Sequence, residues 1–482
     1  MNLEFLDRAA PIIKSFKIFG MYGYKDVSLT CNTPVKIASA DNGSGKTSLL
    51  TALYSIFAGQ GAILYAVDFD SIEIGWGDGS ITSYLKSELF GELVDGGIEE
   101  AASNVFFDQW GSNSRDEVVE LLTKFILGDL DEAAQTRAFS TIHRDSPFDR
   151  QEIFQQLNSI CTPLIQTGAF KELHAKAKEQ LGDVAILYLP TYRRIEADLP
   201  EYRHKNPPVN QAALRKGRGP RDAWDSTRLI YFGMADVESK LNAIVTQIRR
   251  ETLDAFSRNS GQTLEQLIDN KSLIESDGTK SFDLASIEVV LARVGKDSEE
   301  LKSRLSEIIK TNEIFNENRR ELRRFLSQLL RVYSERRDDE KAIENFVNMV
   351  NGYLCPAEEE LLGSTREKKL MFDKLKLELS ISNLITGKDI KFNNLSSGEK
   401  QVVSIFARLM LDPRKKYLIL VDEPELSLSI EWQQRLLPDI CATQNCMQLI
   451  AITHSPFVFD NELEVVSGTI DTAINRKKSG GG

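Results

Sequence analysis

The feature that most constrains this chain is a glycine-rich stretch at residues 40–47, which reads Ala-Asp-Asn-Gly-Ser-Gly-Lys-Thr. The apolar run Val35–Ala40 before it predicts a short strand, and the apolar spacing of Thr47–Ala58 after it predicts a helix. Gly43 and Gly45 permit backbone conformations that turn several N–H groups toward one anion, and the start of a helix adds partial positive charge. The pattern therefore predicts a phosphate-binding loop between a strand and a helix.

Two side chains at the end of this loop have predicted roles in binding ATP and Mg²⁺. Lys46 is expected to reach the β- and γ-phosphates, and the Thr47 hydroxyl to ligate Mg²⁺. Ala40 stands where this pattern usually has glycine, but the position closes the strand and requires only a small residue. A Gly/Ser turn without a ligand is the alternative. The residues expected to bind ATP are Asn42, Gly43, Ser44, Gly45, Lys46, Thr47 and Ser48.

A second cluster of motifs lies about 350 residues further along the chain. The apolar run Tyr417–Val421 predicts a buried strand that ends at two carboxylates. Asp422 is expected to hold Mg²⁺ through water, and Glu423 to polarise the attacking water as general base. Gln448–Thr453 predicts another buried strand, and His454 follows at its carboxyl end, where open α/β sheets bind ligands. Glu423 and His454 are therefore the predicted catalytic residues, with a loop-capping carboxylate pair and a structural histidine as the alternatives.

A third motif, Leu395–Glu399, precedes a predicted helix that runs to about Leu411. A serine hydroxyl, a glycine and free N–H groups at the start of a helix form an anion site. The alternative is a plain helix cap, in which Ser396 pairs with Glu399 three residues later.

Together these motifs resemble the ABC-type ATPase heads of the SMC, RecF and OLD families, over residues 13–60 and 380–470. Leu395–Glu399 is similar to their signature, with Ser397 in place of a glycine, and Glu425–Leu428 falls where their D-loop lies. The resemblance implies that ATP joins two heads, because the signature of one subunit contacts the γ-phosphate held by another. The residues that would act in trans on a second copy of this chain are Ser396, Ser397, Gly398 and Glu399, in a homodimer or higher oligomer.

The expected fold is α/β: an ABC-type P-loop ATPase head, with a mixed sheet flanked by helices, split by insertions and joined to an α-helical hairpin or bundle. Residues 13–60 are expected to contribute two strands, the loop and its helix. The expected segments are 1–67, the first part of the head; 68–182, a helix-rich insertion with glycine-rich breaks; 183–234, a head strand with a basic loop; 235–350, a helical hairpin or short coiled coil; 351–475, the rest of the head; and 476–482, a tail resembling a cloning scar.

Within these segments, amphipathic spacing predicts long helices at Ala235–Asn259, Asp297–Asn316 and Arg319–Met349, which form either a subunit contact or an ordinary helical subdomain. The apolar run Val184–Leu189 predicts a strand. Arg193 and Arg194 follow it, and contact with phosphate or a neighbouring head and a surface ion pair are equally favoured roles for them. The basic stretch 203–222 is expected to be solvated, with a nucleic-acid contact as the alternative.

The sequence predicts a cytoplasmic protein that has no membrane partner. No signal-peptide pattern opens it, and no apolar run approaches the length of a membrane span. Its five cysteines have no Cys-x-x-Cys spacing and are expected to be reduced thiols. The net charge of −12 removes the simplest reason to expect a nucleic-acid partner, which stays possible but not required.

The chain is expected to lack a nuclease centre of its own. Only a short tail follows His454, too little for the Toprim domain of OLD nucleases, and His143, His174 and His204 are too isolated for an HNH site. This arrangement, with Leu187–Glu196 and the signature, resembles the ATPase subunits of two-component anti-phage systems, PARIS first and Septu second. The resemblance implies a separate Toprim- or HNH-type effector, a nuclease or toxin, and a phage trigger protein as partners.

The predicted function is therefore that of an ATP-hydrolysing subunit that senses a phage trigger and controls an effector. A RecF- or SMC-like DNA-repair ATPase that clamps DNA directly is the main alternative. A transporter's cytosolic subunit is less favoured, since about 350 residues separate the phosphate loop from the signature.

Overall fold

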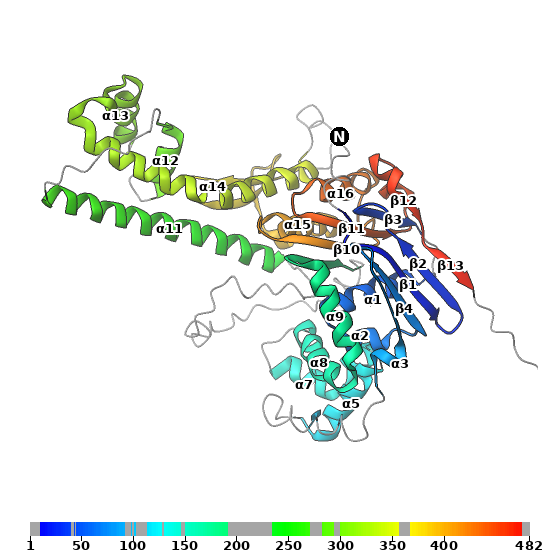
Figure 1. Cartoon of the computed structure of the whole chain (residues 1–482). Coiled ribbons are helices and arrows are strands. Elements are labelled where there is room, and N and C mark those ends of the chain that lie inside the picture. The colour runs from blue at the N-terminus through cyan, green and yellow to red at the C-terminus, as the bar shows by residue number, and fades with distance from the viewer. Residues whose placement is uncertain are drawn as a thin grey trace, which may run out of the picture. The chain divides into compact units, whose positions relative to one another are not determined.

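The computed structural model divides the chain into two compact units, Met1–Tyr231 with Arg414–Gly482, and Phe232–Pro413 (Figure 1). The described residues are 10–39, 43, 45–91, 98, 101–102, 113–127, 130–145, 150–190, 234–269, 282–293, 299–355 and 367–474. Among these residues, none of the helices combines the length and the apolar character needed to cross a membrane.

The first unit contains a parallel sheet in the order β12-β3-β11-β10-β6. Parallel strands buried on both faces read as continuous apolar runs, which is why four of these five strands, all but β12, could be predicted. The strands are β12 (Ser467–Thr469), β3 (Val35–Ser39), β11 (Cys446–Thr453), β10 (Lys416–Asp422) and β6 (Val184–Leu189). Their carboxyl ends meet at one edge. Helix α1 (Lys46–Ala58) packs on this sheet, where Tyr54 lies 5.3 Å from Tyr188 between ring centroids.

An antiparallel sheet in the order β13-β2-β1-β4-β5 completes this unit's strands and corrects two expectations. The strands are β13 (Asp471–Ile474), β2 (Lys25–Thr30), β1 (Ile13–Met21), β4 (Ser71–Trp76) and β5 (Ile81–Leu85). Residues 13–60 therefore hold three strands, where the sequence predicted two. Residues 71–85 belong to this sheet, and not to a helical insertion that begins at 68. The physical reason is the alternation of Ile72, Ile74 and Trp76, which are all fully buried on one face of β4.

A buried glutamine joins the two sheets. The Gln448 side chain on β11 donates from Nε2 to the Ile13 carbonyl oxygen at 2.9 Å and accepts from the Ile13 N–H at Oε1, at 3.0 Å. The side-chain amide therefore makes the two backbone hydrogen bonds to Ile13 that a neighbouring strand would make at the start of β1. Because both bonds are buried, they hold β1 in register with the parallel sheet.

Most of the described residues between β5 and β6 lie in helices. Phe125, Phe139 and Phe154 pack together among them, with ring centroids 5.1 to 5.9 Å apart. The helices of this part are α3 (Lys86–Leu89), α5 (Arg115–Ile126), α6 (Leu130–Gln135), α7 (Arg137–Asp145), α8 (Arg150–Ile165) and α9 (Gly168–Leu181). The first unit also contains α2 (Gly61–Ala66) and α16 (Ile430–Ala442), and short 3₁₀ helices at Pro456–Val458 and Glu462–Val466.

The second unit is built on two long helices, α11 (Met234–Asp269) and α14 (Arg320–Leu354), which lie side by side (Figure 1). They and α13 (Glu299–Lys310) agree with the predicted helices, whereas α12 (Leu284–Arg293) was not predicted. Two 3₁₀ turns, Glu313–Phe315 and Glu317–Arg319, precede α14. A small sheet of β7 (Lys368–Asp373), β8 (Glu378–Asn383) and β9 (Asp389–Ile390) leads through a 3₁₀ turn, Phe392–Asn394, to α15 (Ser397–Met410).

The signature segment belongs to this second unit, although the sequence grouped it with β10 and β11 in residues 351–475. The reason is packing, because α15 lies against α14, and Tyr353 contacts Phe406 with ring centroids 5.7 Å apart. The α/β class with helix-flanked sheets and a helical subdomain is confirmed.

Candidate functional site

The predicted phosphate loop joins β3 to α1, and its two glycines have backbone angles that favour glycine. Gly43 has φ 75° and Gly45 has φ 92°. A Cβ atom on Gly45 would also lie 2.5 Å from the Met21 sulfur, so both conformation and space require glycine there. The described part of the loop thus has the backbone expected of an anion cradle. Asn42 and Ser44, two of the predicted ATP-binding residues, lie outside the described residues, as do Arg193, Arg194 and the basic stretch 203–222.

The start of β2 contacts this loop, and the turn before β2 contacts the first turn of α1, which the sequence did not indicate. Lys25 is buried and donates from Nζ to the Gly43 carbonyl oxygen at 2.8 Å. The Tyr22 hydroxyl lies 2.7 Å from the Ser48 hydroxyl, which places Ser48 at the exposed end of the site. The antiparallel sheet therefore supports the phosphate loop from one side.

The two expected magnesium ligands meet at the end of β10. The Thr47 hydroxyl donates to Asp422 Oδ2 at 2.9 Å, and Asp422 is only 2% exposed. A hydroxyl and a carboxylate oxygen are hard donors of the kind that Mg²⁺ prefers. The donor chemistry of this pair therefore fits the predicted ion.

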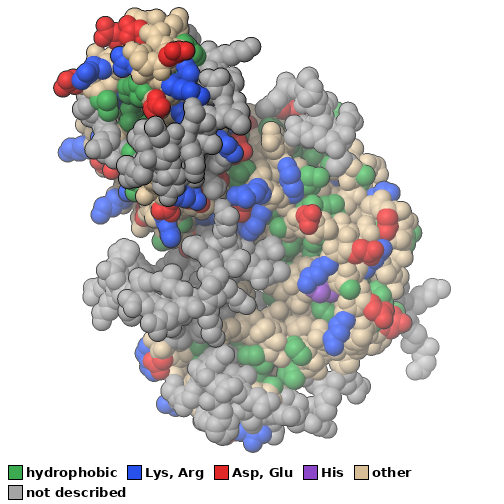
Figure 2. All heavy atoms as spheres, turned by 60° about the vertical axis from the view of Figure 1, so that its left-hand side comes forward, with side chains coloured by type: hydrophobic (Ala, Val, Ile, Leu, Met, Phe, Trp, Pro, Cys, Tyr) green, Lys and Arg blue, Asp and Glu red, His purple; other side chains and the backbone are tan. Residues whose placement is uncertain are grey.

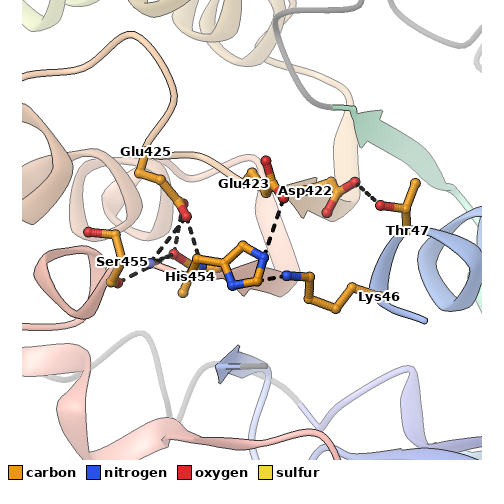
Figure 3. Close-up of polar contacts among 8 residues, drawn as sticks. Lys46, Thr47, Asp422, Glu423, Glu425, His454 and Ser455 are labelled. Atoms are coloured by element: carbon orange, nitrogen blue, oxygen red, sulfur yellow. Dashed lines mark hydrogen bonds and ion pairs between the residues drawn. The ribbon is translucent and has the colours of Figure 1, made fainter. Parts of the chain in front are cut away.

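Lys46, His454 and Glu423 form a connected row across the carboxyl ends of the parallel strands (Figure 3). The Lys46 ammonium lies 3.1 Å from His454 Nδ1, and His454 Nε2 lies 3.6 Å from Glu423 Oε1. An ammonium group can only donate, so Nδ1 accepts and the neutral imidazole has its proton on Nε2. That proton faces Glu423. The predicted phosphate ligand Lys46 and the two predicted catalytic residues, His454 and Glu423, thus lie next to one another.

Glu423 itself has a left-handed backbone, with φ 51°. Its N–H donates to the Ile452 carbonyl oxygen at 2.9 Å, which extends the pairing of β10 with β11 by one residue. Non-glycine residues adopt this conformation at a cost of about 1–3 kcal/mol, and such residues are enriched at functional sites. The turn directs Asp422 toward Thr47 and Glu423 toward His454 (Figure 3).

Glu425 is a site residue to which the sequence assigned no role of its own. Its carboxylate accepts three hydrogen bonds, from the Thr453 hydroxyl at 2.7 Å, the His454 N–H at 2.8 Å and the Ser455 N–H at 3.2 Å. Burial raises the pKa of Glu425, and the bonds from Thr453 and Ser455 and the charge of Lys46 oppose that shift. The dipeptide Pro424-Glu425 after the carboxylate pair was the available signal, but it does not identify the partners.

The signature residues form a reciprocal helix cap at the start of α15. The Ser396 hydroxyl accepts from the Glu399 N–H at 3.4 Å, and Glu399 accepts from the Ser396 N–H at 2.7 Å. Lys368 of β7 lies 2.6 Å from the same Glu399 carboxylate. Ser397 opens the helix and Gly398 is buried in its first turn. The capping alternative therefore describes the local structure, and the role of these residues in trans stays a prediction.

Comparison with known proteins gives two partial sequence matches. Residues 291–460, about a third of the chain, match the family described as AAA domain, putative AbiEii toxin, Type IV TA system. The Retron Ec83 probable ATPase of Escherichia coli is 32% identical over 101 residues, which are 18% of this chain and 19% of that protein. The chain thus matches less than a fifth of this curated relative's length. Both matches agree with the ATPase class expected from the sequence.

Among solved structures, an Smc head domain with an extended coiled coil from Pyrococcus furiosus is 14% identical, with a TM-score of 0.32 and coverage of 96% of both chains. A second Smc head, bound to the winged-helix domain of ScpA, is 11% identical, with a TM-score of 0.31 and coverage of 96% of this chain and 98% of that one. The fold assignment rests on the strand order and not on these likenesses.

Proposed function

We propose that this chain binds and hydrolyses ATP with Mg²⁺, as a subunit of a bacterial anti-phage defence system that controls a separate effector. The observation that supports ATP hydrolysis most strongly is the cluster at the carboxyl ends of β3, β10 and β11. It brings together a phosphate-binding lysine, a hydroxyl–carboxylate pair, a second carboxylate and a histidine, namely Lys46, Thr47, Asp422, Glu423 and His454.

Each side chain has one part in the proposed reaction. Lys46 neutralises charge on the β- and γ-phosphates, and Thr47 and Asp422 hold the metal. Bound Mg²⁺ supplies charge neutralisation on the phosphate oxygens. Glu423 accepts a proton from the attacking water, and the His454 Nε2–H donates to a γ-phosphate oxygen. Glu423 thus activates the nucleophile, and the neighbouring His454 binds the transferred phosphoryl group.

The defence role is supported by the two sequence matches, since one names a putative toxin of a toxin–antitoxin system and the other a retron ATPase. A general defence-associated ATPase is the class that both favour. Within it, we favour the two-component arrangement of PARIS, with Septu second. A phage trigger would change the conformation of the paired heads. The effector, which would be a Toprim- or HNH-type nuclease or a toxin, would bind one conformation of the heads more tightly than the other.

A DNA-clamping repair ATPase is the second candidate, favoured by the paired long helices α11 and α14. On the face in Figure 2, the Lys and Arg side chains of the described residues are interspersed with Asp and Glu side chains. The net charge of −12 also weakens a long-range attraction to DNA. DNA-stimulated hydrolysis with a steep salt dependence would favour the clamp.

The direct test is enzymatic. We expect the purified chain to hydrolyse ATP with Mg²⁺ and to leave DNA and RNA intact with Mg²⁺ or Mn²⁺. Phosphate release and gel analysis of nucleic acids measure the two activities, and co-purification from native cells identifies the small protein that accompanies the chain. Cleavage that persists through repurification and disappears with a point mutation in this chain would contradict a separate effector. Absence of hydrolysis with or without the co-purified protein would contradict the proposed ATPase.

Sharing of the site across subunits gives a second prediction. Ser396→Arg should leave ATP binding by a single head intact but abolish hydrolysis and ATP-dependent pairing, because a bulky cation replaces the signature serine. A mixture of Ser396→Arg with Lys46→Ala forms pairs that retain one intact composite site. We therefore expect the mixture to recover part of the hydrolysis that each variant lacks alone.

The control is Thr386→Arg, which adds the same charge to an exposed turn of the same unit. Its hydrolysis should equal that of the wild type. Mass photometry or crosslinking establishes that mixed pairs form. If mixed pairs are present and hydrolysis does not recover, the signature does not act in trans.

A further inference from the structure

Three consecutive residues at the end of β11 donate hydrogen bonds to one carboxylate. Glu425 Oε2 accepts from the Thr453 hydroxyl, and Oε1 accepts from the backbone N–H groups of His454 and Ser455. The Thr453 side chain is fully buried, and Glu425 is half-buried beside it. In a low-dielectric setting such charge-assisted bonds are stronger than they are in water. The carboxylate therefore fixes the backbone from which the His454 imidazole projects.

The side chain of Gln433 links helix α16 to the segment that follows Glu425 and to Ser455, one of the residues that donate to Glu425. Gln433 in the first turn of α16 accepts from the Ser455 hydroxyl at Oε1, at 2.7 Å. Its Nε2 donates to the Leu428 carbonyl oxygen at 3.0 Å, on the segment that follows Glu425. The donor segment 453–455 and the acceptor segment 425–428 are thus held in one arrangement before any ligand binds.

The orientation of the His454 ring determines its contacts with both Lys46 and Glu423. Its two nitrogens face Lys46 at 3.1 Å and Glu423 at 3.6 Å, so a rotation of the backbone at 454 would change both contacts together. A displacement of about 1 Å in a catalytic group can lower a rate by roughly 10²-fold. A carboxylate that only closes the loop would affect stability and leave the chemistry of a folded protein unchanged. The two roles therefore differ in what they predict for turnover.

We infer that Glu425 is a positioning residue for His454, which aligns the imidazole between the phosphate-binding lysine and the general base by holding the backbone of residues 453–455. The inference rests on the proposed ATPase function and deepens it. Glu425 does not contact the substrate in this role. It acts through the orientation of His454.

Substitutions of Glu425 test this role by separating turnover from binding. In Glu425→Ala, kcat for ATP should fall by roughly 10- to 100-fold, while KM changes by less than about 3-fold, because the phosphate loop is untouched. Glu425→Gln should retain kcat to within about 3-fold, since its Oε1 can accept both backbone N–H groups and its amide can donate to the Thr453 hydroxyl. Glu464→Ala, at an exposed position after β11, is the matched control and should be unchanged.

Combination with His454→Ala shows whether Glu425 acts through the histidine. In that background, Glu425→Ala should cost less than about 2-fold further in kcat, because two residues that act as one unit are not additive. An equal loss in both backgrounds would overturn the inference. So would wild-type kcat in Glu425→Ala, or a loss expressed mainly in KM.

Glu425→Asp keeps the test decisive if the alanine variant does not fold. It retains the charge, but its carboxylate is one methylene too short to reach all three donors, so the same loss in kcat is expected. Wild-type kcat in Glu425→Asp would then overturn the inference. Failure of the proposed function is a separate result, since the wild-type chain itself would then not hydrolyse ATP.

Discussion

Replacement of Glu423 by glutamine is expected to slow ATP hydrolysis by roughly 10²- to 10⁴-fold, the usual range for loss of a general base. Glutamine preserves the size of the side chain and still has an oxygen that can face His454 Nε2, now 3.6 Å from the carboxylate. What it removes is the capacity to take a proton from water. The left-handed backbone at residue 423 is no worse for glutamine than for glutamate, so the fold should be unaffected.

ATP binding should survive this change, because the groups expected to contact the phosphates and the metal lie on Lys46, Thr47 and Asp422. Single-turnover hydrolysis and equilibrium binding of a fluorescent ATP analogue measure the two steps separately. Glu464→Gln provides the same chemical change at an exposed position and should retain wild-type turnover. Normal turnover in Glu423→Gln, with hydrolysis by the wild type established, would remove Glu423 from the role of base.

The strands that carry this site could be predicted because their burial is complete. β10 and β11 lie in the middle of a parallel sheet, so Tyr417–Val421 and Gln448–Thr453 read as apolar runs that end at the functional residues. Parallel strands also share one edge for their carboxyl ends. The distances show that this edge brings Lys46, Glu423 and His454 together, while their roles in the reaction stay predictions.

The antiparallel strands could not be predicted in the same way. From sequence alone, the stretch Gly75-Trp76-Gly77-Asp78-Gly79 predicts a glycine-rich break in a helix-rich insertion. In the structure Gly75 and Trp76 end β4, and Gly79, with φ 89°, lies in the hairpin turn to β5, where Asp78 accepts from the Ser80 N–H at 2.7 Å. An Asp-Gly pair after alternating apolar residues is a hairpin signal. The acidic, helix-favouring composition of the residues that follow predicts helix for the whole segment and so masks this hairpin signal.

Contacts between distant segments set the other limit of prediction. The partners of Glu425 lie 28–30 residues further along the chain, and Lys25 reaches Gly43 across 18 residues. Neither pair has a spacing that helix or strand periodicity would join. Only the folded arrangement of β1, β2 and β11 around the phosphate loop brings them to the site.

Replacement of Lys46 by alanine is expected to abolish ATP binding at micromolar concentrations, with a loss of affinity of at least about 10²-fold. A hydrogen bond to a charged group contributes about 1.5–3 kcal/mol, and Lys46 is expected to bond two phosphates. The side chain is only 6% exposed, and the Gly45 and Lys46 backbone anchors it at the start of α1. Water would therefore replace the ammonium poorly in this confined position.

Lys14→Ala is the matched control, because it removes the same charge from an exposed position on β1 in the same unit. Its affinity for ATP should equal that of the wild type. Calorimetric titration measures the affinity, and thermal unfolding in the absence of nucleotide establishes that both variants are folded. ATP should raise the unfolding temperature of Lys14→Ala and not that of Lys46→Ala, since only a ligand that binds the folded state stabilises it. Affinity within about 3-fold of wild type in a folded Lys46→Ala variant would mean that the glycine-rich loop does not bind the phosphates of ATP through this lysine.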